Sequence, residues 1–300
     1  NNFANFAAPN KFAQQFSKSI KKILPQFDKF ILCNSGAEAN IKALRICRAV
    51  TKKNKIAIIS GSWHGSADQL LFTLNNKNSL VPISDGVDPF IKNNVIIIPN
   101  NNYEKSIKLL TKNLNQICCI IAEPIQGCLP DKKNVEYLKK INQFCKKNNL
   151  IFLLDEIISG LRFKDGSLQK LINIHSDVST FGKCFGSGMP LGFIGISKKI
   201  SKKIEKNKLK IFFGGTFSGN SLSMFIVNEF LSFFIKNKKK IIDDLNYKTQ
   251  YFVDNMNDYF YKNDLDIKVY HFQSVARIVF SRKNIRDRVQ RDFLEKKKSK

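Results

Sequence analysis

The sequence has little of the chemistry that makes metal sites, disulfide frameworks and membrane spans. Its 300 residues include three histidines and seven cysteines, and the cysteines contain no C-x-x-C pair. The histidines are far apart, at positions 64, 175 and 271, so neither a metal site nor a disulfide framework is predicted. No charged leader with a following apolar segment is found, and no apolar run approaches about twenty residues. We therefore expect a cytoplasmic protein without membrane contact.

Acidic residues are also scarce, since 24 Asp and Glu stand against 50 Lys and Arg, a formal net charge of +26. Such an imbalance indicates a nucleic-acid or acidic-surface binder when the basic residues form a patch. Here the lysines are spread through the chain, and no zinc-finger, RRM, KH or basic-zipper pattern accompanies them. We interpret the excess as solvated surface and predict no nucleic-acid partner; a basic nucleic-acid-binding protein is the alternative.

What the sequence does contain is enough apolar material for a large core. Its hydrophobic fraction is 43%, and its length suffices for one large domain or two unequal ones. Short apolar runs alternate with stretches of helical spacing. The runs are 29–32, 56–59, 95–98, 117–122, 150–154 and 193–196, and the helical stretches include 11–24, 38–50, 103–113 and 135–148. Continuous hydrophobicity in the runs predicts an α/β fold, with helices flanking a mostly parallel central sheet.

The end of the sequence has a different pattern. A helix is predicted over 222–235, followed by a basic loop and by two short apolar runs at 269–272 and 276–280. These features predict the start of a smaller α+β domain. Ligands of parallel sheets bind beyond the carboxyl ends of the strands, so the residues that follow each predicted strand are the candidate site.

Two of these strand ends carry candidate ligand-binding residues. Ser35, with Glu38 three residues later, forms a capping box before a helix. The same geometry, with Gly36 allowing close approach of the backbone, suits a phosphate at the helix N-terminus, so both interpretations stay open. After the next strand, Trp63 and His64 lie between two glycines. Trp63 is either a core residue or an aromatic that lies against a planar ring, and His64 is either a loop residue or a second aromatic brace.

Two further strand ends carry a carboxylate and a lysine. Asp155 follows the run 150–154, where a carboxylate is costly without a positive partner such as a protonated ring nitrogen; the alternative is an aspartate that caps a loop. Lys183 lies between an apolar run and a glycine-rich loop, where a lysine can lose its proton and act as an amine nucleophile. A later glycine-rich loop, 214–220, has in Thr216 a hydroxyl that can reach a phosphate.

In their order along the chain, these motifs resemble those of the class III pyridoxal-phosphate-dependent aminotransferases of fold type I. Within that family they are most similar to the glutamate-1-semialdehyde 2,1-aminomutase branch, and the resemblance covers residues 30–224. It implies pyridoxal 5′-phosphate as cofactor and small-molecule substrates, namely an amino donor and a carbonyl acceptor. For the aminomutase branch, it implies formation of 5-aminolevulinate in the tetrapyrrole pathway.

The resemblance also implies catalytic and phosphate-binding roles. Lys183 would bind the cofactor aldehyde covalently and later shuttle a proton between substrate and cofactor carbons. Asp155 would keep the pyridine nitrogen protonated, so that the ring acts as an electron sink. Ser35, Gly36 and Ala37 would contact the phosphate; because the family often has Thr in place of Ala37, a hydroxyl contact is lost there.

Four more residues match positions around the cofactor ring and the subunit boundary. Trp63 stands where the family usually has a stacking tyrosine, and His64 follows it as a second brace. Gln126 is similar to the ring-hydroxyl contact of ordinary class III aminotransferases, whereas aminomutases commonly have a small apolar residue there. Thr216 matches the residue that reaches the phosphate of the neighbouring subunit's cofactor, which implies a homodimer.

Against the family pattern, the chain divides into three parts. Residues 1–28 are the remainder of an N-terminal segment, 29–220 the large cofactor-binding domain, and 221–300 a linking helix with an incomplete small domain; we expect both ends to be abbreviated. The substrate remains open, because residues 188–192 favour the aminomutase branch and Gln126 favours a transaminase acting on another amino acid, amine or sugar. A pseudoenzyme that keeps the fold without turnover is a further alternative.

Overall fold

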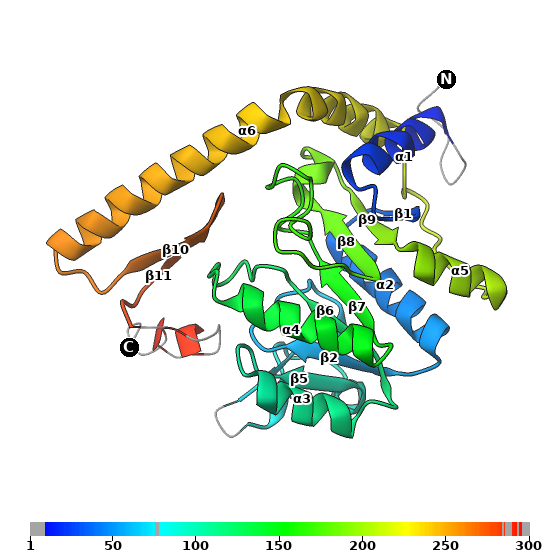
Figure 1. Ribbon diagram of the computed structural model, residues 1–300, viewed down its shortest axis with the longest axis horizontal. Helices are drawn as coiled ribbons and strands as arrows, with labels where there is room; N and C mark the ends of the chain where they lie inside the picture. Colours follow the sequence, from blue (N-terminus) through cyan, green and yellow to red (C-terminus); the bar gives the residue numbers. More distant parts are fainter. Residues whose placement is uncertain (1–9, 76–77, 284, 286–289, 293, 296–300) are drawn as a thin grey trace.

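The computed structural model describes residues 10–75, 78–283, 285, 290–292 and 294–295, so residues 1–9 of the predicted N-terminal segment lie outside it, as does part of the end of the chain. Its centre is a seven-stranded sheet in the order β1-β9-β8-β7-β6-β2-β5 (Figure 1). The strands are β1 (Lys29–Cys33), β2 (Lys55–Ile59), β5 (Val95–Ile98), β6 (Ile117–Ala122), β7 (Ile151–Asp155), β8 (Val178–Gly182) and β9 (Gly192–Ile196). Neighbours are parallel from β8 to β5, and β9 is antiparallel to β8 and β1. The prediction of a mostly parallel sheet is confirmed.

Helices cover both faces of this sheet. They are α1 (Lys11–Ile23), α2 (Gly36–Thr51), α3 (Tyr103–Lys112), α4 (Asn134–Lys147), α5 (Lys198–Lys206) and α6 (Ser221–Lys262). Helices α2 and α5 pack on the face that includes Ile121, and α3 and α4 pack on the face that includes Ile120. The start of α6 and α1 enclose Phe181 and Phe193. Because both faces are covered, all six residues of β6 are buried, which explains its continuous apolar run.

Two small sheets and three 3₁₀ turns complete the described part of the chain. β3 (Phe72–Leu74) pairs antiparallel with β4 (Leu80–Pro82), and β10 (Lys268–Phe272) pairs antiparallel with β11 (Val275–Val279). The 3₁₀ turns are η1 (Asp68–Leu70), η2 (Pro89–Asn94) and η3 (Lys183–Gly186). Strands β10 and β11 coincide, to within one residue, with the two apolar runs predicted after the long helix.

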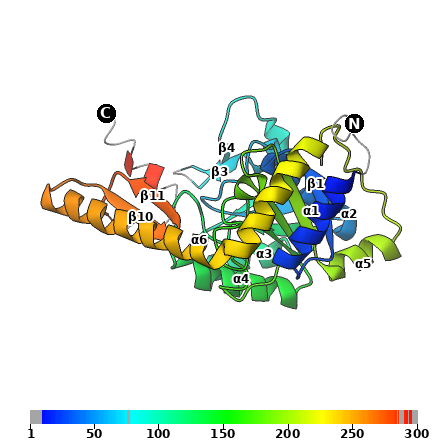
Figure 2. The ribbon, with the colours of Figure 1, turned by 90° about the horizontal axis from the view of Figure 1, so that it is seen from above.

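Helix α6 is much longer than predicted. It has 42 residues and includes the basic segment 236–240, which we predicted as a loop. That prediction was wrong because lysine is a good helix former and because the buried residues Ile242 and Val253 continue the apolar stripe beyond the lysines. Helix α6 packs against α1 near its start and against β10 near its end (Figure 2). It therefore connects the large sheet to the two C-terminal strands as one continuous helix.

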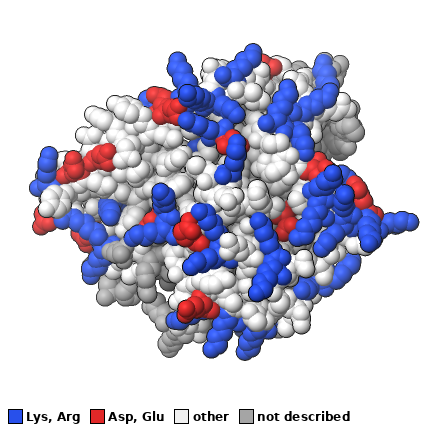
Figure 3. All heavy atoms as spheres, viewed as in Figure 1, with Lys and Arg blue, Asp and Glu red and all other residues white. Residues whose placement is uncertain are grey.

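The seven cysteines are free thiols and five of them are buried, where a thiol behaves as a small hydrophobic side chain. Among the described helices, none combines the length and the hydropathy that crossing a bilayer requires. On the face seen in Figure 3, basic side chains are scattered among other residues rather than gathered into one track.

Candidate active site

The candidate residues converge on one edge of the large sheet. Strands β2, β6, β7 and β8 are parallel, so their carboxyl ends meet at the same edge. Strand β1 has the same direction, because β9 lies antiparallel between it and β8. The residues at or just beyond these ends are Ser35, Trp63, Glu123, Asp155 and Lys183. This is the edge at which α/β sheets bind their ligands.

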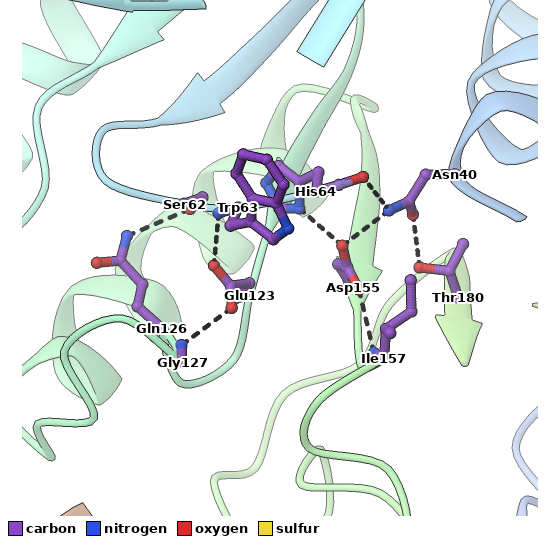
Figure 4. A network of polar contacts seen from close by, with 10 residues as sticks. All are labelled: Asn40, Ser62, Trp63, His64, Glu123, Gln126, Gly127, Asp155, Ile157 and Thr180. Atoms are coloured by element: carbon purple, nitrogen blue, oxygen red, sulfur yellow. Dashed lines mark hydrogen bonds and ion pairs between the residues drawn. The ribbon is translucent and has the colours of Figure 1, made fainter. Parts of the chain in front are cut away.

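Asp155 lies at the centre of this edge in a network of hydrogen bonds (Figure 4). Its side chain is buried, and its Oδ2 accepts hydrogen bonds from Asn40 Nδ2 at 2.9 Å and from His64 Nδ1 at 2.8 Å. Its Oδ1 accepts one from the backbone N–H of Ile157 at 3.1 Å. Thr180 Oγ1 in turn donates to Asn40 Oδ1 at 2.7 Å. The network orients the carboxylate, and Oδ1 keeps a lone pair with which it can accept from a positively charged group.

This arrangement changes the interpretation of His64. We predicted a loop residue or an aromatic brace, whereas the imidazole is fully buried behind Asp155 and hydrogen-bonded to it. Its Nε2 is buried without a hydrogen-bond partner. His64 is thus a loop residue, the first of the two predicted alternatives, and it positions the carboxylate.

Asn40 and Thr180 were not among the site residues predicted from the sequence. A signal for Asn40 was present in the sequence, because it lies on the buried face of α2 beside Ala39 and Ala43, where an unpaired amide is costly. An asparagine on an apolar helix face indicates a partner elsewhere in the fold, although the sequence does not say which.

The next carboxylate in the chain faces other partners. Glu156 is fully buried and accepts hydrogen bonds from Ser159 Oγ, Ser167 Oγ, Leu168 N–H and Gln169 Nε2. Burial raises the pKa of its carboxyl above the usual value. Glu156 thus anchors the segment that follows β7, and Asp155 remains directed to the carboxyl edge.

Ser35 begins α2, as predicted, and its Oγ accepts a hydrogen bond from the Glu38 N–H at 3.1 Å. The Glu38 carboxylate reaches back to the N–H of Asn34 at 2.7 Å, one residue before the expected partner. A Cβ added to Gly192, at the start of β9, would lie 2.1 Å from the Ser35 carbonyl oxygen. The close approach of β9 requires this glycine and holds the first N–H groups of α2 at the sheet edge, where they can bind an anion.

Trp63 and Gln126 lie at the same edge as Asp155. Trp63 is 43% exposed, so its interpretation as a core residue was wrong, and its N–H donates to Glu123 Oε1 at 2.8 Å. Gln126 is buried, and its Nε2 donates to the Ser60 carbonyl at 3.0 Å and to Ser62 Oγ at 3.2 Å. Gln126 therefore holds the loop that carries Trp63 (Figure 4).

Lys183 follows β8 with a strained backbone. It is exposed and has φ 45°, in the left-handed region that lysine rarely adopts. Lys52 and Lys208 adopt the same region, so the backbone conformation alone does not distinguish Lys183 from other lysines. Thr216 is exposed on the loop between α5 and α6, and that loop contacts the residue before Ser35, because Asn34 Nδ2 donates to Ser218 Oγ at 3.3 Å.

Glu123 is a buried carboxyl at this edge with a strongly shifted pKa. Burial raises the pKa of its carboxyl to about 7; His64 and the N–H groups of Gly127 and Trp63 lower it, and Asp155 raises it. In the unfolded chain the carboxyl has an ordinary pKa of 4.5.

We expect this shift to make the folded state less stable as the pH rises from 5 to 8. The folded protein retains the Glu123 proton to higher pH than the unfolded chain, so its free energy of unfolding should fall by about 2.5 kcal/mol across this window. Urea unfolding at several pH values measures the effect as the difference between the protein and Glu123→Gln. Glu136→Gln, at an exposed glutamate, is the control for the substitution. A difference that does not change with pH would contradict the assignment.

The chain is similar to known proteins over most of its length. The family described as Aminotransferase class-III matches residues 2–268. The glutamate-1-semialdehyde 2,1-aminomutase of Wigglesworthia glossinidia brevipalpis is 33% identical over 284 residues, which are 92% of this chain and 64% of that protein. The chain thus spans slightly less than two thirds of this relative's length.

Two solved structures have the same fold. An omega-transaminase from Sphaerobacter thermophilus superposes with a TM-score of 0.84 at 20% identity and covers 96% of this chain and 67% of its own. A glutamate-1-semialdehyde-aminomutase from Pseudomonas aeruginosa superposes with a TM-score of 0.79 at 16% identity and covers 93% and 63%. Their likeness confirms the predicted fold, a mostly parallel sheet flanked by helices with a small C-terminal sheet.

Proposed function

Because the chain belongs to the class III aminotransferase family, we propose that it transfers amino groups with pyridoxal 5′-phosphate as its cofactor. We propose further that it acts as a glutamate-1-semialdehyde 2,1-aminomutase, the name of relatives that are 30% to 33% identical to it. The observation that carries the proposal is the buried Asp155 network at the sheet edge, with Lys183 following the adjacent strand.

The side chains and backbone N–H groups at this edge fit the proposed cofactor. The Asp155 carboxylate suits a protonated pyridine nitrogen, and the N–H groups at the start of α2, at Gly36 and Ala37, with the Ser35 hydroxyl, suit its phosphate. The exposed Trp63 indole offers a face for the ring, and Lys183 an amine for its aldehyde. When bound, the cofactor supplies an electron sink for the negative charge that develops on the substrate carbon.

The protein's own residues would divide the remaining work. Asn40 and His64 hold Asp155, whose charge would then keep the proton on the ring nitrogen of the bound cofactor. The Lys183 amine takes a proton from the substrate carbon and returns one, a task that suits a long side chain with rotatable bonds. Gln126 and Glu123 hold the loop that carries Trp63 and so would keep the indole where it can contact the cofactor ring.

Incubation with glutamate-1-semialdehyde tests the proposed reaction. We expect 5-aminolevulinate to appear without a second substrate, because the donor and acceptor carbons belong to one molecule. Product absent from a protein that is yellow and carries covalently attached cofactor would reject the aminomutase and retain the aminotransferase. A protein that binds no cofactor would reject both.

A class III transaminase that uses two substrates is the second candidate, and Gln126 favours it because ordinary family members have glutamine there. In this conformation the Gln126 amide donates hydrogen bonds to Ser60 and Ser62 and accepts one from Asn100. Ping-pong kinetics with an amino donor and a keto acid would identify this alternative.

We also propose a homodimer. Thr216 lies on an exposed loop that also carries the exposed aromatic residues Phe212 and Phe217, which a second subunit would cover. Analytical ultracentrifugation tests it, and a monomer at micromolar concentration would contradict it. The cytoplasmic location and the domain boundaries at residues 28 and 220 stay predictions.

A further inference from the structure

A second pocket lies at the same carboxyl edge of the sheet, beyond β5. It has a volume of about 640 Å³ and is lined by the loops that precede α3 and α4. One hydrogen bond connects it to the proposed active site, from Asn100 Nδ2 to Gln126 Oε1 at 3.4 Å. Its lining includes Tyr103, Tyr137, Leu129 and Ile285, and neither Asp155 nor Lys183. The pocket is therefore a separate site with room for a small organic molecule.

The charge of this pocket is positive. Three lysines line it, Lys105, Lys133 and Lys140, against one aspartate, Asp131. The Asp131 Oδ1 is engaged by the Lys133 N–H at 2.9 Å, and the Lys140 ammonium lies 5.8 Å from the centre of the Tyr103 ring. Helices α3 and α4 both begin at the pocket, so their unpaired N–H groups add to the positive potential.

Helix α4 begins with a residue that is unfavourable there. Lys133 is its N-cap, has helical backbone angles and makes no side-chain capping bond, while the Asp131 carboxylate two residues earlier accepts the Lys133 N–H. A lysine at the positive end of a helix dipole raises the energy of the helix, whereas Asp, Asn or Ser would lower it. An anion in the pocket would remove this conflict, because it would pair with the ammonium group and with the first N–H groups of the helix.

An unpaired donor points to the same conclusion. Asn134 is 7% exposed and lines the pocket, and its Oδ1 accepts a hydrogen bond from Asn101 Nδ2. Its Nδ2 is buried without a hydrogen-bond partner. A buried donor without a partner is costly, and an acceptor bound in the pocket would satisfy it.

From these observations we propose that the pocket binds a small phosphate-bearing metabolite. Lysines and helix N-termini are the groups that bind phosphate as point charges and N–H donors. The tyrosine, leucine and isoleucine side chains of the lining would contact the organic part of the same molecule.

Isothermal titration with inorganic pyrophosphate tests the proposal. The protein is first saturated with pyridoxal phosphate and dialysed, so that the phosphate-binding end of α2 is occupied. In 0.15 M salt we expect one site with a Kd below about 1 mM. Lys133→Asp should weaken binding at least about tenfold and leave the melting temperature without ligand unchanged or higher, because a negative charge is favourable at the positive end of the α4 dipole.

Two further variants separate this site from general attraction to a basic protein. Lys140→Gln should also weaken binding. Lys202→Glu should not, although it alters the charge of an exposed residue on α5 by the same amount as Lys133→Asp. Equal binding by the protein and Lys133→Asp would overturn the proposal. Tighter binding of citrate than of pyrophosphate would overturn the assignment to phosphate. Because none of these readouts is turnover, they do not depend on the reaction proposed above.

Discussion

Lys183→Ala is expected to lower kcat/KM at least about a thousandfold, the largest loss of any single substitution in this protein. Lys183 is the amine that follows β8 at the sheet edge, one strand from Asp155. If Lys183 has the proposed roles, its removal takes away both the covalent attachment of the cofactor and the proton carrier. Borohydride reduction followed by mass spectrometry of the peptides measures the attachment directly, and the variant should show none.

The chain offers a close control for this substitution. Lys208 is also exposed and also has a left-handed backbone, with φ 47° against 45° for Lys183. Lys208→Ala therefore reproduces the loss of a charge and the strain of an alanine at positive φ, and it should retain activity. A Lys183→Ala protein that still forms the fixed adduct at another lysine would refute the assignment.

Asp155→Asn is expected to lower kcat about a hundredfold or more while the cofactor stays attached to Lys183. The substitution keeps the shape of the side chain and removes the negative charge that would hold a proton on the ring nitrogen. The absorption spectrum of the bound cofactor as a function of pH reports that proton, so it distinguishes lost charge from lost folding.

Asp88→Asn is a suitable control, because Asp88 caps a 3₁₀ turn by accepting from the Phe90 N–H and asparagine can do the same. His64→Ala and Asn40→Ala should have smaller effects in the same direction, since they loosen Asp155 without removing its charge. Unchanged kcat and an unchanged spectrum in Asp155→Asn would show that this carboxylate does not face the ring.

Much of the fold is present in local patterns of the sequence. The runs at 56–59, 95–98 and 117–122 predict β2, β5 and β6 to within one residue, because strands covered on both faces are apolar throughout. Helix α6 was predicted too short, because a run of lysines looks like a loop when its packing partners are unknown. The partners are α1 and β10, which lie far from the lysines in sequence.

The candidate site, like the fold, was predicted from the sequence only in part. The residue types at the strand ends, a carboxylate, a lysine and a helix start, predicted what each can do chemically. His64 shows the limit of that approach, since nothing local distinguishes a stacked imidazole from one buried behind a carboxylate 91 residues away. Gln126 is a similar case, because its partners Ser60 and Ser62 belong to another loop.

The sequence by itself therefore determined the class of fold and the order of the main strands and helices along the chain, and it predicted which residues carry chemistry, because these depend on hydrophobic spacing and on side-chain type. The tertiary structure alone decided that Asn40, His64 and Thr180 surround Asp155, that Glu123 holds its proton to about pH 7, and that three lysines and two helix ends share one pocket. The physical reason is that hydrogen bonds and burial act over a few ångströms, and residues far apart in sequence come that close only when the chain is folded.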